Sequence, residues 1–152
     1  KDGSVDHAQT EVVHNLMPTE GMTHMLNTQF HGGTQVTTWY LGVFGNNYTP
    51  VLGDIAATFP GVAGEITTLY DEATRVVFNE SAASNGTIDN AANRAEFTFN
   101  GAATVYGGFM SSAAAKGATS GVLASVVRFA SPKVLEDEAV LRITAGFTLV
   151  NV

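Results

Sequence analysis

The clearest hydrophobic pattern in the chain runs from Val36 to Phe44, where β-branched and aromatic residues follow one another without a charged residue. Odd-numbered positions such as Trp39 and Leu41 fall on one face of the predicted strand, and even-numbered positions such as Tyr40 on the other. Apolar residues on both faces are typical of a central strand that is covered on both sides. We therefore expect strand 36–44 to lie inside a sheet, with later segments as its neighbours.

Further strand-like segments follow, separated by turn-forming residues. The expected strands are Ile66–Tyr70, Arg75–Asn79, Thr87–Asp89, Ala95–Asn100, Ala103–Met110, Val122–Ala130 and Val140–Val150. Residues 140–150 alternate most regularly, which is the antiparallel pattern with one face on the core and one toward solvent or a neighbouring subunit. About seven or eight strands without a long helix between them predict a mostly all-β fold, a two-sheet antiparallel sandwich of jelly-roll or immunoglobulin-like type. Residues 36–152 would form the sandwich, and residues 1–35 an N-terminal arm with short helices, within one domain.

Glycine and proline mark the boundaries between these segments. Asn85-Gly86 and Asn100-Gly101 are typical of tight turns. The pair Gly107-Gly108 inside a strand indicates a bulge or the close approach of another backbone. We expect Ser131-Pro132-Lys133 and the acidic turn Glu136-Asp137-Glu138 to separate the last two strands.

In the first 35 residues, apolar residues recur with the period of a helix and not of a strand. Between His7 and Met17 apolar residues recur near that period, and Pro18 would end a helix of about three turns, or an arm that orders only against a neighbour. A second helix is expected over Thr19–Phe30, with Thr19 as its N-cap. It would end at His31-Gly32-Gly33.

The connection over residues 45–64 contains several prolines and glycines. Such long connections often serve binding or assembly. Within it, Asp54 would cap one helical turn through Phe59, which Pro60 and Gly61 would end.

Six apolar residues of the N-terminal stretch form the protein interface that we expect. They are Val12, Val13, Leu16, Met17, Met22 and Met25. Two alternatives stay open: a helix packed on the chain's own sandwich, or an arm docked on another chain. The low surface charge and the proline and glycine breaks favour docking.

Composition narrows the choice of function. The chain has 152 residues, the length of one domain, and a net charge of −7 with basic residues scattered singly. Nucleic acid and anionic membranes are therefore not expected as partners. Only 14% of the residues are charged, against roughly 25% in a typical soluble chain, so we expect other protein to cover part of the surface.

Two sequence features bear on compartment and covalent chemistry. The absence of cysteine excludes disulfides and thiolate nucleophiles. No apolar run approaches the roughly 20 residues of a membrane helix, and the start lacks the apolar region of a signal peptide. We expect a soluble protein that is assembled where it is made.

No group of residues predicts a catalytic chemistry, a metal or a cofactor. The histidine pairs His7/His14 and His24/His31 lack the i,i+4 spacing that ligand pairs on a helix need, so we expect solvated or interface histidines. The acids at Asp71-Glu72 and 136–138 lie on predicted turns, where neighbouring carboxylates point apart. We expect Arg75 to pair with Glu72, the acids of 136–138 to be solvated, and the protein not to be an enzyme.

Five segments carry a resemblance to known proteins. They are Gly33-Thr34-Gln35-Val36-Thr37-Thr38-Trp39-Tyr40-Leu41-Gly42-Val43-Phe44, Asn47-Tyr48-Thr49-Pro50, Asp54-Ile55-Ala56-Ala57-Thr58, Tyr70-Asp71-Glu72-Ala73-Thr74-Arg75 and Ser120-Gly121-Val122-Leu123. With these segments the chain resembles small virion proteins of tailed bacteriophages, of the capsid decoration (cement) type, over most of residues 18–150. The resemblance includes no catalytic motif.

The resemblance implies a β-rich subunit that binds the capsid exterior in many copies and bridges neighbouring major capsid proteins. Its partners would be the major capsid protein and copies of itself, as a trimer in preference to a dimer. An alternative is a fibre, spike or tail-associated module that binds another virion protein, or host glycan through Trp39, Tyr40 or residues 45–64. A third is a β-sandwich hydrolase that uses Asp71 or Glu72.

Overall fold

The computed structural model of the chain describes residues 10–151. Strands and isolated bridges make up 34% of the described residues, and the strands lie in antiparallel sheets with few short helices. The strand content exceeds the roughly 20–25% of an average globular domain. The expectation of a β-rich fold is therefore confirmed.

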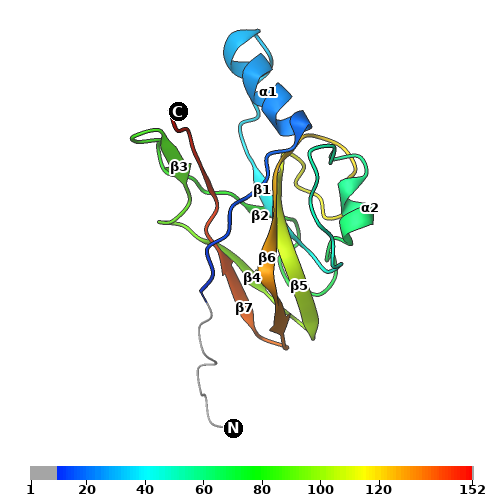
Figure 1. The fold of residues 1–152 in the computed structure, drawn as a ribbon. Coiled ribbons are helices and arrows are strands. Elements are labelled where there is room, and N and C mark those ends of the chain that lie inside the picture. Colours follow the sequence, from blue (N-terminus) through cyan, green and yellow to red (C-terminus); the bar gives the residue numbers. More distant parts are fainter. Residues whose placement is uncertain (1–9, 152) are drawn as a thin grey trace.

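Three antiparallel sheets contain the named strands (Figure 1). The elements in chain order are α1 (Thr19–Phe30), β1 (Tyr40–Phe44), α2 (Phe59–Ala63), β2 (Val76–Val77), β3 (Thr87–Asp89), β4 (Ala95–Thr98), β5 (Ala103–Ser111), β6 (Leu123–Leu135), β7 (Val140–Ile143) and β8 (Gly146–Thr148). One sheet has the order β2-β1-β5-β6, and β3 pairs with β8 and β4 with β7. The predicted position of β1 inside a sheet is confirmed.

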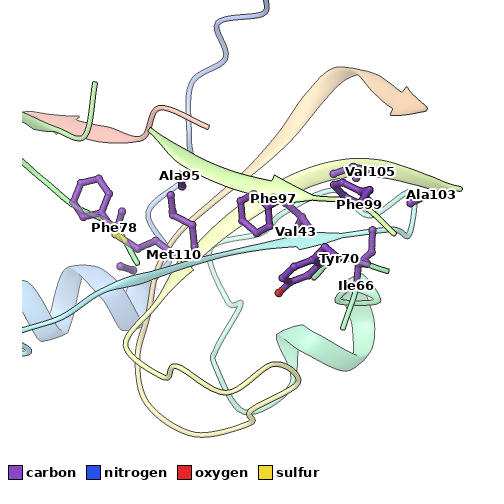
Figure 2. Close-up of a cluster of buried hydrophobic side chains, with 12 residues drawn as sticks. Val43, Ile66, Tyr70, Phe78, Ala95, Phe97, Phe99, Ala103, Val105 and Met110 are labelled. Carbon is purple, nitrogen blue, oxygen red and sulfur yellow. The ribbon is translucent and has the colours of Figure 1, made fainter. Parts of the chain in front are cut away.

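The main core lies between the four-stranded sheet and the β4–β7 ladder (Figure 2). Phe97 of β4 and Phe99 just after it pack with Val43 of β1 and Val105 of β5. Phe97, Val43 and Val105 are completely buried. In the sequence, Ala95, Phe97 and Phe99 alternate with Glu96 and Thr98, which predicts this inward face, and the burial of the three residues confirms it.

A second cluster covers the other face of the four-stranded sheet. Phe59 of α2 contacts Phe44 of β1 edge-to-face, with 5.7 Å between ring centroids, and Phe109 of β5 at 5.2 Å. Phe44 and Val43, neighbours in β1, therefore point into different clusters. Strand β1 is covered on both sides, as its two apolar faces predicted.

Two glycine-containing predictions are also confirmed. Asn85 and Gly86 have φ values of 51° and 75° and form the tight turn before β3. At Gly107 the register between β5 and β6 shifts, and a Cβ there would lie only 2.1 Å from the carbonyl oxygen of Val127. No residue larger than glycine fits this approach of two backbones without a shift.

Strand β1 is shorter than predicted, because a strand extends only as far as its neighbours. It begins at Tyr40, which pairs with Ser111 at the end of β5, and not at Val36. The partner on its other side, β2, has only two residues. Residues 36–38 are therefore outside the sheet, and Trp39 contributes one carbonyl, which accepts a hydrogen bond from the Phe78 N–H at 2.8 Å.

The expected helix His7–Met17 is wrong for residues 10–17, and its first three residues lie outside the described chain. Leu16 exchanges two backbone hydrogen bonds with Val126, of 2.7 and 2.8 Å, so the edge of β6 satisfies backbone groups that a helix would have paired internally. The helix Thr19–Phe30 is confirmed. Its N-cap, however, is Pro18 and not Thr19, whose N–H donates to Leu52.

The C-terminal strands differ from the prediction in two ways. Residues 131–133 do not separate strands, because β6 continues through them to Leu135. The expected strand Val140–Val150 is divided into β7 and β8, which pair with different partners. Asn90 holds the break: its amide donates to the Ile143 carbonyl at 3.2 Å and its side-chain oxygen accepts from the Ala145 N–H at 2.8 Å.

Three shorter predictions are corrected. Residues 66–70 make no strand, and strand Arg75–Asn79 shrinks to Val76–Val77. The helical turn expected through Phe59 is present, because the Phe59 N–H donates to the Ile55 carbonyl at 3.0 Å, but Asp54 accepts from Tyr48 and Val51 and does not cap it. Pro60 does not end it either: α2 follows over Phe59–Ala63, and its C-cap Gly64 is left-handed with a φ of 66°. Pro60 lies in the first turn of α2, where a missing N–H costs no hydrogen bond.

Candidate interaction surface

Helix α1 presents its apolar residues away from its own sheet. Of its twelve residues, all within the described chain, only Gly21 is buried. A Cβ on Gly21 would lie 2.7 Å from the carbonyl oxygen of Ala124, so glycine lets the helix approach β6. With 3.6 residues per turn, Leu26 and Phe30 fall on the opposite side of the helix. Leu26 is 55% exposed and Phe30 79%.

Four apolar residues form a stripe along α1. Met25, Leu26 and Phe30 are exposed and Met22 is half-buried. Met22 lies three residues from Met25 and four from Leu26, and Leu26 lies four from Phe30, so these side chains are neighbours on the helix surface. An amphipathic helix normally turns such a stripe toward its own core. We call these four residues the α1 stripe. Contiguous exposed apolar surface of this kind is typical of an interaction site.

A groove of about 390 Å³ lies beside the α1 stripe. Met17 and Met25 line one side, and Ile88, Phe147 and Leu149 of the β3–β8 ribbon and its continuation line the other. Figure 1 shows α1 projecting from the end of the sheet at which β3 and the C-terminal end also lie. The α1 stripe and the groove, which share Met25, therefore form one apolar end of the molecule.

The structure brings together only part of the predicted interface. Met17 and Met25 line the groove, and Met22 belongs to the α1 stripe. Val12 is 90% exposed, and Leu16 pairs with β6. The described part of the N-terminal arm therefore runs along its own chain, while its methionines lie at the apolar end.

Sequence reasoning missed most of this surface. Leu26 and Phe30 carried a usable signal, because they share helical spacing with Met22. Ile88, Phe147 and Leu149 carried none, since only the pairing of β3 with β8 brings them beside α1.

A second exposed apolar surface lies on the loop before α2 and on α2 itself. It consists of Val51, Leu52, Ile55 and Val62, which are 39–56% exposed. We call it the 51–62 surface. Figure 1 shows α2 and β3 on opposite sides of the base of α1. The 51–62 surface and the α1 stripe therefore lie on different elements, which meet where the Thr19 N–H donates to the Leu52 carbonyl at 2.9 Å.

Buried carboxylates hold the loop that carries the 51–62 surface. The Tyr48 hydroxyl donates to Asp54 Oδ1 at 2.5 Å, and the Val51 N–H donates to Oδ2 at 2.9 Å. The hydrogen bond to Asp54 raises the pKa of Tyr48 to about 12. Glu20 accepts hydrogen bonds from the N–H groups of Ala56 and Leu123 and so joins α1, the loop and β6.

Charge is distributed unevenly along the chain. From Gly21 to Gly53 there is no Asp, Glu, Lys or Arg, although the whole chain carries a net charge of −7. This stretch contains α1 from Gly21 onward and the start of the 51–62 surface. Depletion of charged residues distinguishes the centre of a protein interface from the remaining surface.

The most buried charges in the described chain form a structural clamp. Arg75 pairs with Glu65 at 2.7 Å, and both side chains are 1% exposed. The predicted pair of Arg75 with Glu72 is therefore wrong. Glu65 is in reach because it bridges to Phe44 at the end of β1. Glu72 instead accepts a hydrogen bond from the Thr98 N–H.

The remaining candidates do not assemble into a reactive site. No three His, Asp or Glu side chains of residues 10–151 lie close enough to hold a metal ion. His7 lies outside the described residues, His14 and His31 are exposed, and His24 contacts Trp39 edge-to-face. The acids at 136–138 are exposed, as predicted. Trp39 is half-buried and packs against the main core.

Comparisons with known proteins do not assign the chain to a family. The sequence matches no known protein family and no curated protein. Within residues 10–151, no helix has the length and apolar character needed to span a membrane.

Proposed function

We propose that the chain is a structural subunit of a bacteriophage virion, of the capsid decoration type. It binds the outer capsid surface and stabilises the shell by bridging neighbouring capsid proteins. The observation that carries the proposal is the presence of two separate exposed apolar surfaces, the α1 stripe with its groove and the 51–62 surface, on an acidic chain. A bridging subunit needs more than one contact surface, since it joins more than one neighbour.

Binding of many copies to a capsid lattice would make two small contact surfaces per subunit sufficient. Once one contact has formed, a second on the same subunit forms at a high effective concentration, so weak contacts add up to tight binding. The resemblance of five sequence segments to phage virion proteins supports the same role. The partners would be the major capsid protein and copies of the chain, on the capsid exterior.

The chain would act through binding alone, without catalysis, metal or cofactor. In the described residues, ionisable side chains either face solvent or are engaged in internal contacts such as the Arg75–Glu65 pair. None of the residues that line the groove is ionisable. A binding role needs no ionisable side chains there, whereas the hydrolase alternative requires two carboxylates facing one substrate.

We also propose that the β4–β7 ladder and the four-stranded sheet are the two layers of a small antiparallel sandwich. Side chains from both layers meet in the main core, which supports this arrangement. The immunoglobulin-like or jelly-roll type belongs to the same proposal.

The test is the copy number of the chain in purified phage particles that encode it, measured by quantitative gel densitometry. Hundreds of copies per particle, and lower resistance to heat or chelators in particles that lack the chain, would support capsid decoration. A few copies per particle, together with clear hits on a glycan array, would favour the fibre or spike alternative. Absence of the chain from particles would refute both.

A further inference from the structure

We propose that copies of the chain associate through the apolar end, with the α1 stripe of one copy in the groove of a second copy. This inference deepens the proposed function by naming the surface through which copies meet. The choice of a second copy as the occupant rests on that proposed function and on the two arguments that follow, from charge and from shape.

The first argument concerns acidic charge. Two copies of a chain with a net charge of −7 repel each other, and acids opposed across an interface disfavour association. The α1 stripe lies within the uncharged stretch 21–53, and no residue that lines the groove is charged. Two copies can therefore bring these surfaces together without burying like charges.

Basic side chains do not offer an alternative contact between copies, because internal partners engage most of those described. Arg75, Lys133 and Arg142 form salt bridges within the chain. Lys116 donates to the Tyr70 carbonyl, and Arg128 to side chains of the loop after β1. A second acidic copy thus finds little free positive charge, which favours contact at the uncharged end.

The second argument concerns shape. Met22, Leu26 and Phe30 follow one another at four-residue intervals on a projecting helix, the spacing of side chains that anchor a helix in an apolar groove. The groove is concave and lies at the same end of the molecule. One chain therefore carries both halves of the contact, which is the condition for a symmetric homo-oligomer. Reciprocal insertion gives a dimer, and head-to-tail insertion around an axis gives a trimer.

The first experiment is sedimentation equilibrium of the purified full-length chain and its variants. We expect the wild type to form dimers or trimers, and Leu26→Glu to raise the dissociation constant at least tenfold. Leu52→Glu is the matched control, because Leu52 is 56% exposed and Leu26 55%, yet Leu52 lies on the 51–62 surface. We expect the control to associate like the wild type. Circular dichroism of each variant checks that it is folded.

A cross-linking experiment tests the contact directly, since the chain has no cysteine of its own. Under oxidation, a mixture of Phe30→Cys and Leu149→Cys chains should form a disulfide-linked heterodimer. A mixture of Leu52→Cys and Leu149→Cys chains should not. A monomeric wild type, an unchanged Leu26→Glu, or equal cross-linking in both mixtures would overturn the inference. The virion role would survive that result, because copy number in particles tests it separately.

Discussion

Replacing Arg75 by methionine tests whether the buried clamp holds the loop between β5 and β6. The Arg75 side chain is 1% exposed, and its guanidinium donates to five acceptors. The acceptors are Glu65 Oε1 at 2.9 Å, Glu65 Oε2 at 2.7 Å, Ser111 Oγ at 3.2 Å, the Ala113 carbonyl at 3.0 Å and the Ala118 carbonyl at 3.1 Å. Methionine retains most of the side-chain length but donates nothing. Glu65 would then remain as a buried charge without a cation.

The expected loss follows from the burial of the pair. Removing one partner of a buried ion pair costs about 3–5 kcal/mol, because the other charge stays out of water. For a domain of this size, each kcal/mol shifts the melting temperature by roughly 2–4 °C. Arg75→Met should therefore lower the melting temperature by about 6–20 °C.

Arg142→Met is the matched control. Arg142 pairs with Glu96 at 2.6 Å, as closely as Arg75 with Glu65, but the two side chains are 55% and 53% exposed. Exposed pairs contribute only about 0–1 kcal/mol, because solvent screens them. The difference between the two arginine variants therefore measures what burial and the additional hydrogen bonds of Arg75 contribute beyond a single exposed ion pair.

Urea unfolding of both variants gives the free energies, and amide hydrogen exchange over residues 113–118 shows whether the loop opens locally. We expect faster exchange there in Arg75→Met alone, because the carbonyls of Ala113 and Ala118 lose their donor. If Arg75→Met is no less stable than Arg142→Met, the clamp does not stabilise the fold and the reasoning from burial is refuted.

Two further substitutions test close packing and a shifted pKa. Gly107→Ala should lower the free energy of unfolding in urea by about 1–3 kcal/mol, because its Cβ would lie 2.1 Å from the Val127 carbonyl oxygen. Gly61→Ala is the control and should be near neutral, since its Cβ would meet no atom within 4 Å. Equal effects of the two substitutions would contradict this reasoning. The pKa of Tyr48 is raised from 10.0 to about 12 by its hydrogen bond to Asp54. The stability that this hydrogen bond contributes is complete below pH 10 and is lost as the pH rises through 12. The free energy of unfolding of Tyr48→Phe should therefore depend less on pH in alkaline solution than that of the wild type. Parallel curves of unfolding free energy against pH would contradict the assignment.

Local alternation predicted the inward faces well but the strand ends poorly. Phe97 and Phe99 point into the core as expected, because the period of two is a property of the strand itself. The start of β1 was misplaced by four residues, at Val36 and not at Tyr40. No local signal marks that boundary, since it depends on where β5 and β2 end.

The division of residues 140–150 into two strands also shows that local alternation does not predict where a strand ends. Their alternation continues past Ile143, yet β7 and β8 join different ladders. The side chain of Asn90, more than fifty residues earlier, binds both sides of the break. A single polar contact between distant residues thus overrides a regular hydrophobic pattern, because a buried amide must find hydrogen-bond partners.

The candidate site was predictable in residue type but not in position. Helical spacing placed Met22 and Met25 on one helix, and the structure confirms that helix. Spacing alone does not show which way an apolar stripe faces. Here the opposite side of α1 approaches β6 through Gly21, a residue that carries no hydrophobic signal at all.

Charged side chains with internal partners hold the segments that carry the exposed apolar surfaces. The Arg75–Glu65 pair and the Glu20 and Asp54 carboxylates fasten loops through internal hydrogen bonds. Loops held in this way present the 51–62 surface already ordered, and Glu20 holds α1 against the same body. Association of ordered surfaces avoids much of the entropy that flexible side chains and loops would lose on binding. In the capsid role that we propose, this saving of entropy would recur at every copy bound to the lattice.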